Sequence, residues 1–233
     1  MTGPNAHEHK LFRFFDCRFD LADFGAGRRL YLEGHVPGAV FLDLETDLSG
    51  SGGSGGRHPL PTAEEFAATA SRAGIGPGVL AVAYGNGAAR LWWLLRHFGH
   101  DDAAVIDAWH GPRSTGEERP EPAEFVPHER TDDLIGADEL AARLPELVVV
   151  DARAPERWRG EREPIDPIAG RIPGSLNWPA GTQQPPLPEG ELVAYCGSGV
   201  AACELVLKAD RPARLYAGSW SDWITHDLPI EKG

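Results

Sequence analysis

A cysteine followed by a glycine-rich turn is the part of this 233-residue chain best suited to chemistry. Cys196 follows the apolar run of residues 192–195 and is followed by Gly197, Ser198, Gly199, Val200 and Ala201. The pattern predicts a buried strand, a tight turn and a helix over residues 200–208. Glycines let backbone N–H groups point inward, and the positive end of the helix also favours an anion. We therefore interpret Cys196 as a thiolate nucleophile rather than a packing residue.

The turn also separates two kinds of thiol chemistry. Phosphatases with a similar cysteine loop close it with an arginine, which binds the phosphate through paired hydrogen bonds. Here the sixth residue after Cys196 is Ala202, and the turn contains no arginine. The loop therefore lacks the cation that would bind a phosphate, and phosphatase activity is not expected.

Charge and cysteine content exclude other classes of function. The net charge is −13 without a basic run, which argues against binding nucleic acid or an anionic membrane. No apolar segment approaches the roughly 20 residues of a membrane span, and residues 1–10 lack the apolar core of a signal peptide. Three cysteines without a CxxC pair argue against disulfides or a zinc site. We expect no metal or cofactor, a reducing cytoplasm, and packing roles for Cys17 and Cys203.

The elements that position Cys196 recur in the first half of the chain. An apolar run ends in Asp-x-Arg at Asp16 and again at Asp151, and a Gly-x-Val/Ile-Pro-Gly turn follows at residues 34–38 and 170–174. Short apolar runs that alternate with helical segments are typical of parallel α/β units. We predict an α/β fold of two tandem domains, each a parallel sheet of five strands, or a similar number, flanked by helices.

The two copies differ at the loop and in their middle. Gly85 stands where the second copy has Cys196, so the first loop has no thiol at this position. The second copy is shorter, mainly because it lacks a helix predicted over residues 62–74, which begins with a capping box. We place the domains at residues 1–120 and 132–233, and we expect the glycine–serine loop at residues 49–56 to be mobile.

Taken together, these motifs resemble those of the tandem rhodanese-type sulfurtransferases. The resemblance extends from Phe15 to Trp223 and includes the Gly-Arg-His-Pro-Leu-Pro segment at residues 56–61 and the Gly-Ser-Trp segment at residues 218–220. The Cys196 loop resembles that of the 3-mercaptopyruvate branch, whereas the thiosulfate branch typically has a basic pair after the cysteine. The resemblance implies a single active site, in the C-terminal domain. The first domain is then an inactive copy, which agrees with Gly85 in place of the cysteine.

The implied reaction moves sulfane sulfur from a donor, with 3-mercaptopyruvate favoured, through a Cys196 persulfide to a thiol or cyanide. Backbone N–H groups of residues 197–201 would hold the negative charge. A small thiol or a thioredoxin-like protein is the expected acceptor. Two alternatives remain open: a thiosulfate sulfurtransferase, and a degenerate member that carries a persulfide or binds a partner without efficient turnover.

The resemblance also implies a triad-like row of side chains. By position the row consists of Glu45, His58 and Ser198, with glutamate in place of the usual aspartate. Glu45 would orient His58 from a side chain that is one methylene longer, and His58 would supply or relay a proton.

Donor binding is expected to depend on arginine. Arg157 matches a family arginine that reaches the donor, and Ile165 stands where a second one is expected, just before Asp166. The family's usual histidine in the second Pro-Gly turn is Arg171 here. We therefore expect Arg157 to bind the donor carboxylate, alone or together with Arg171.

Overall fold

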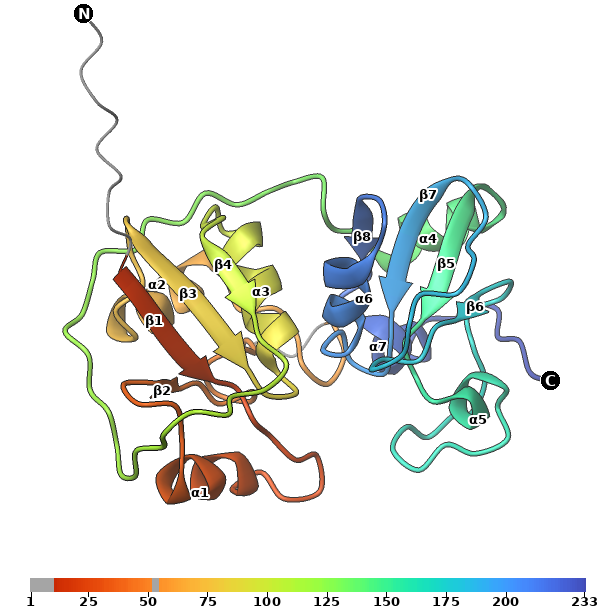
Figure 1. Ribbon diagram of the computed structural model, residues 1–233. Helices are drawn as coiled ribbons and strands as arrows, with labels where there is room; N and C mark the ends of the chain where they lie inside the picture. The colour runs from red at the N-terminus through yellow and green to blue at the C-terminus, as the bar shows by residue number, and fades with distance from the viewer. Residues whose placement is uncertain (1–10, 52–54) are drawn as a thin grey trace, which may run out of the picture.

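The computed structural model describes residues 11–51 and 55–233. Two separate parallel sheets lie side by side, with strand orders β2-β1-β3-β4 and β6-β5-β7-β8 (Figure 1). The tandem α/β prediction is confirmed, with four strands in each sheet. Part of the glycine–serine loop, residues 52–54, lies outside the described residues, as do residues 1–10. No helix in the described ranges is long and apolar enough to span a bilayer.

The first half alternates strands and helices as its repeated pattern predicts. The capping box is formed, since the Thr62 hydroxyl accepts a hydrogen bond from the Glu65 N–H, and the Glu65 carboxylate accepts one from the Thr62 N–H. The elements are β1 (Leu11–Asp16), α1 (Ala26–Glu33), β2 (Val40–Phe41), α2 (Ala63–Arg72), β3 (Val79–Tyr84), α3 (Ala88–His97) and β4 (Ala103–Val105).

The second half has the shorter middle that the sequence predicts, because no helix separates β6 from β7. The helix expected from residue 200 begins two residues later, since the preceding residues still belong to the turn. The elements are α4 (Ala137–Arg143), the 3-10 helix η1 (Leu144–Glu146), β5 (Leu147–Asp151), α5 (Pro155–Trp158), β6 (Leu176–Asn177), β7 (Glu191–Tyr195), α6 (Ala202–Lys208), β8 (Ala213–Leu215) and α7 (Ser219–Trp223).

The Asp-x-Arg motif builds the same buried frame in both halves. Asp151, at the end of β5, accepts hydrogen bonds from the backbone and the guanidinium of Arg153, and Arg153 donates to the Gly170 carbonyl at 2.7 Å. Asp16 and Arg18 repeat this arrangement in the first half. The frame ties the end of each central strand to the following Pro-Gly turn.

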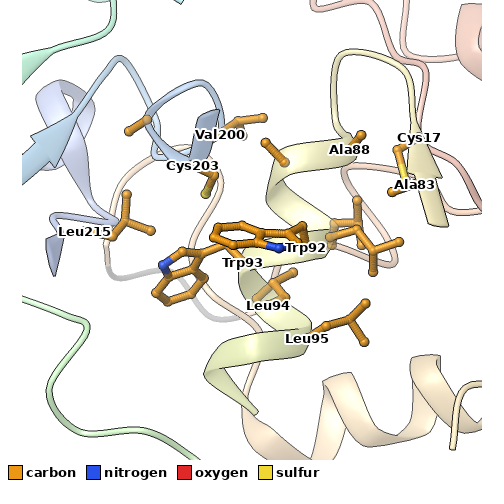
Figure 2. Close-up of a cluster of buried hydrophobic side chains, with 14 of the residues drawn as sticks. Cys17, Ala83, Ala88, Trp92, Trp93, Leu94, Leu95, Val200, Cys203 and Leu215 are labelled. Atoms are coloured by element: carbon orange, nitrogen blue, oxygen red, sulfur yellow. The ribbon is translucent and has the colours of Figure 1, made fainter. Parts of the chain in front are cut away.

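The two halves meet through an apolar contact between α3 and α6. Trp92 and Trp93 of α3 belong to one continuous core that also contains Val200, Cys203 and Leu215 of the second half (Figure 2). Burial of large aromatic side chains of this kind is a strong stabilising contribution. The domains are thus joined by shared core as well as by the connecting chain.

The segment after β4 stays on the first half before it crosses over. Ser114 pairs with His35, the Ala123 N–H donates to the Ser71 carbonyl, and the Arg130 N–H donates to the His97 carbonyl. Figure 1 shows this segment passing around the first sheet before it reaches α4. The domain boundaries at residues 120 and 132 remain a prediction.

Candidate active site

Cys196 directly follows β7, and its loop is held by the start of α7. The backbone N–H groups of Trp220 and Ser221 donate to the carbonyls of Cys196 and Gly197, each at 2.9 Å. Because α7 supplies the donors for these two carbonyls, the loop does not use its own N–H groups to bind them, and those groups are left for the sulfur. The Gly199 N–H lies 3.1 Å from the Cys196 Sγ. The loop can therefore stabilise negative charge on this sulfur.

Gly199 is required by its backbone and its surroundings. Its φ is +78°, and a Cβ atom there would lie 2.2 Å from the Ala217 carbonyl oxygen. Val200 and Ala201 complete the loop and line the cavity in front of Cys196. That cavity has a volume of about 430 Å³, and residues of both halves form its walls.

Three of the expected side chains form a row next to Cys196. The Ser198 Oγ lies 2.7 Å from His58 Nδ1, and His58 Nε2 lies 2.9 Å from Glu45 Oε1. Because a carboxylate accepts from Nε2, the neutral ring carries its proton there, and Nδ1 accepts from the Ser198 hydroxyl. Burial lowers the pKa of His58 from its usual value, against the opposing effect of Glu45. His58 is therefore neutral near pH 7 and can accept a proton.

The guanidinium groups of Arg57 and Arg157 lie beside the Cys196 loop. Arg157, on α5, hydrogen-bonds to Glu163 and to Asp166 Oδ2, the latter at 3.1 Å. Arg57, which precedes His58 in the chain, pairs with the other oxygen of Asp166. Both arginines line the cavity with Cys196. Burial raises the pKa of Asp166 above its ordinary value, although both arginines pull it in the opposite direction.

Comparison with known proteins decides the family. A protein of Pseudomonas aeruginosa with the name "Probable 3-mercaptopyruvate sulfurtransferase" is 42% identical, over 90% of this chain and 88% of its own length. The human 3-mercaptopyruvate sulfurtransferase is 34% identical, over 87% of this chain and 81% of its own. The chain belongs to the rhodanese-type sulfurtransferase family. SseB of Mycobacterium tuberculosis, which carries a thiosulfate sulfurtransferase name, is 37% identical over 94% of this sulfurtransferase and 90% of SseB.

Solved structures agree with the fold. The 3-mercaptopyruvate sulfurtransferase of Leishmania major matches with a TM-score of 0.76 and 27% identity, over 96% of this chain and 76% of that one. No protein-family model matches the sequence.

Arg171 does not line the cavity in front of Cys196 in this sulfurtransferase. Its guanidinium pairs with the Glu231 carboxylate, donates to the Gly233 carbonyl at 2.7 Å and lies over the Trp158 ring. It is absent from the residues that line the cavity. The expectation that Arg171 assists in donor binding is therefore not supported, because the C-terminal segment takes up its charge. Ile165 is exposed and also lies outside the cavity wall.

The other two cysteines are buried in apolar surroundings. The Cys203 thiol donates to the Gly199 carbonyl at 3.2 Å, and burial raises its pKa to about 12. Burial also raises the pKa of Cys17 well above the usual value. Both groups therefore stay protonated near neutral pH, as packing residues do. Among the described residues, no group of three or more histidines, cysteines or carboxylates is placed to hold a metal ion.

Two arginines that bear on the site were not identified from the sequence. Arg57 could have been found, because it adjoins His58 within the Gly-Arg-His-Pro segment. Arg90 lies on the apolar helix α3 and gives no such signal. It is fully buried and donates to the carbonyls of His58 at 2.9 Å and Gly199 at 3.4 Å. Arg90 thereby ties the His58 segment to the Cys196 loop across the domain contact.

Glu45 also lines a second cavity in the sulfurtransferase, of about 980 Å³. This larger cavity is formed by the first half and by residues of the segment after β4, including Glu118 and Pro120. The Glu45 side chain is 38% exposed, whereas that of His58 is 4% exposed. The row of three side chains therefore runs from the cavity in front of Cys196 to the larger cavity lined by Glu45, where it is more exposed to water.

Proposed function

We propose that this sulfurtransferase takes sulfur from 3-mercaptopyruvate onto Cys196 and passes it from the persulfide to a thiol. The observation that carries the proposal is the row of Ser198, His58 and Glu45 beside the cysteine loop. This row provides the proton relay that a carbon leaving group requires. The names of the Pseudomonas and human relatives favour the same donor.

The first half-reaction needs a nucleophile and a proton relay. The Cys196 thiolate attacks the donor sulfur, an S–S bond forms, and the C–S bond breaks with its electron pair passing to carbon as the enolate of pyruvate. The proton that was on the donor sulfur ends on that carbon, so no proton is consumed. Ser198 and His58 would carry it, since His58 is neutral and its Nδ1 accepts from the hydroxyl.

The loop and the arginines would supply the remaining stabilisation. The Gly199 N–H, at 3.1 Å from Cys196 Sγ, would stabilise the thiolate that attacks the donor and that leaves again in the second half-reaction. Arg157 would bind the donor carboxylate, for which the planar guanidinium offers paired N–H groups.

The second half-reaction transfers the outer sulfur to an acceptor. An acceptor thiolate attacks it, a new S–S bond forms, and Cys196 leaves as the thiolate. We propose a small thiol or a thioredoxin-like protein as acceptor and the cytoplasm as the place of reaction, where thiols are kept reduced. The proposed steps need no metal or cofactor.

Steady-state kinetics with both donors test this proposal. We expect a higher kcat/KM for 3-mercaptopyruvate than for thiosulfate, with cyanide or a dithiol as acceptor. The name of the Mycobacterium relative keeps thiosulfate as the second candidate. A clear preference for thiosulfate would refute the donor assignment. Persulfide formation without efficient turnover on either donor would favour a persulfide carrier.

A further inference from the structure

The cavity in front of Cys196 is where the proposed function places the donor, and we call it the donor cavity. An arginine of the first domain also lines it, and the proposed function gives that arginine no role. Three arginines line the cavity: Arg57, Arg153 and Arg157. Arg153 belongs to the buried frame, where Asp151, Glu163 and the Gly170 carbonyl take up its N–H groups. Arg57 and Arg157 have side chains that are 30% and 14% exposed. These two are the arginines of the cavity wall within reach of a bound molecule.

Arg57 is held in place by the second domain. Its backbone N–H donates to the Ser221 Oγ at 3.0 Å, beside the turn that supports the Cys196 loop. A Cβ atom at the preceding residue, Gly56, would lie 2.5 Å from the Gly218 carbonyl oxygen, so the backbones touch here. The approach is close because Gly56 has no side chain. The position of Arg57 is therefore set by the catalytic domain.

One carboxylate aligns the two guanidiniums. Asp166, whose side chain is 3% exposed, pairs with Arg57 Nη1 through one oxygen and with Arg157 Nη2 through the other. Each guanidinium has five N–H groups, so this contact leaves further donors on both arginines. Arg57 Nη2 lies 3.0 Å, and Arg157 Nη1 lies 3.5 Å, from the position that a Cβ would occupy at Gly197. Two amino groups thus converge on the residue that follows Cys196.

We propose that Arg57 is a second donor-binding residue, supplied by the first domain, that selects donors carrying a carboxylate beside the reacting sulfur. The inference rests on the proposed function, since it assumes that the donor lies at Cys196. A carboxylate there would accept one hydrogen bond from Arg57 and one from Arg157, which fixes both its position and its plane. The exposed Ile165 contributes no charge to this part of the cavity.

The experiment compares Arg57→Ala and Arg57→Lys with Arg159→Ala. Arg159 is a matched control, because it lies two residues after Arg157, at the end of α5, but pairs with Glu161 outside the cavity. We expect Arg57→Ala to raise KM for 3-mercaptopyruvate by about 10- to 100-fold, as for a lost charge-assisted contact. Arg57→Lys should recover part of this loss, because it restores charge but not the planar geometry. Arg159→Ala should match the parent.

Two further measurements separate donor binding from a structural role. Pyruvate binding to the Cys196→Ser protein, measured by calorimetry, should weaken by a similar factor when Arg57→Ala is added. Cyanide should discharge persulfide-loaded Arg57→Ala at the parental rate, because cyanide has no carboxylate.

Unchanged pyruvate binding and KM in Arg57→Ala would overturn the inference while leaving the sulfurtransfer proposal intact. Slower discharge would also overturn it, by pointing to a distorted loop. In contrast, a parent enzyme that forms no persulfide from 3-mercaptopyruvate would refute the proposed donor, and the pyruvate titration would still test Arg57.

Discussion

The loops that follow β3 and β7 start from the same arrangement at the end of the strand, but different parts of the chain contact them. In both halves a tyrosine ends the strand, and its hydroxyl accepts a backbone N–H from the Pro-Gly turn at 3.2 Å, from Val36 to Tyr84 and from Ile172 to Tyr195. After this shared point the chains diverge. Gly85 has a φ of +94°, and a Cβ atom there would lie 2.8 Å from the Arg18 backbone nitrogen.

The first loop is closed by its own domain. The Gly87 N–H donates to the Cys17 carbonyl at 2.9 Å, and the Asn86 amide exchanges two hydrogen bonds with the Phe19 backbone. In the second half, α7 binds the loop carbonyls instead and leaves the Gly199 N–H for sulfur. The frame alone therefore does not make a site. The second loop differs from the first in that a helix, α7, binds its carbonyls, while a loop N–H group contacts the cysteine sulfur.

Replacing the nucleophile should have the largest effect. Cys196→Ser is expected to abolish sulfur transfer, because a serine hydroxyl stays protonated and cannot accept sulfane sulfur. Mass spectrometry of the intact parent after exposure to donor should show one added sulfur that cyanide removes. Cys17→Ser and Cys203→Ser serve as controls and should retain most activity. Transfer that survives in Cys196→Ser would contradict the assignment.

Breaking the relay should have the next largest effect. His58→Gln is expected to lower kcat with 3-mercaptopyruvate by about 100- to 10,000-fold, the usual contribution of a positioned acid–base group. Because burial lowers the pKa of His58, the acid limb of the parental pH profile should lie below the usual histidine value of about 6.5. The exposed His110 provides the control, and His110→Gln should leave rate and profile unchanged. A parental rate in His58→Gln would exclude the relay.

The same histidine should link stability to pH. A native pKa below the unfolded value of about 6.5 means that the unfolded chain binds the proton first. The contribution of His58 to the free energy of unfolding is therefore present above pH 6.5 and is lost as the pH falls toward the native pKa. Denaturant unfolding between pH 7.5 and 5 should show a smaller decline in His58→Gln than in the parent, and an equal decline would count against this.

Removing Arg157, the exposed cavity arginine that belongs to the second domain, should have a moderate effect on catalysis. Arg157→Ala is expected to reduce kcat/KM for 3-mercaptopyruvate by about 1.5–3 kcal/mol, or roughly 10- to 150-fold, as for a lost hydrogen bond to a charged group. Arg171→Ala is the informative contrast, because its guanidinium is taken up by Glu231. Its kcat and KM should stay near the parental values. Steady-state kinetics on both variants test this, and equal losses in the two variants would contradict the special role of Arg157.

Placing a thiol in the first loop should have the smallest effect on function. Gly85→Cys is expected to lower stability by about 1–3 kcal/mol, because it forces a side chain into a left-handed backbone conformation against Arg18. The number of sulfurs acquired from the donor should remain one per chain. Gly116→Ala is a control for backbone strain alone, since its φ is +87° with no atom within 4 Å of a Cβ. A second transferable sulfur in Gly85→Cys would mean that the first loop also forms a site.

The frame and the loop could be predicted because short local patterns determine them. Asp16 and Asp151 end apolar strands and are followed two residues later by an arginine, so their mutual contact is built within one turn of chain. The capping box at Thr62 is equally local. α6 begins two residues later than predicted, because the apolar pattern does not separate Val200 and Ala201 of the turn from the helix that follows.

Contacts between distant segments were harder to foresee. The pairing of Arg171 with Glu231 could not be foreseen, because Glu231 lies 60 residues away and returns to this turn only in the folded chain. Arg57 adjoins His58 and could have been noticed, but its pairing with Asp166 could not be foreseen, since Asp166 belongs to the other domain. Long arginine side chains are directed by whichever carboxylate the fold brings near, and a single sequence does not reveal that choice.

The row from Ser198 to Glu45 also has a consequence for traffic through the enzyme. Its inner end opens on the donor cavity, and its outer end opens on a different, larger one. The His58 side chain is 4% exposed, whereas the Glu45 carboxylate belongs to a side chain that is 38% exposed and is in contact with water. At the Glu45 end, the row could therefore exchange protons with bulk water even while a molecule occupies the cavity in front of Cys196.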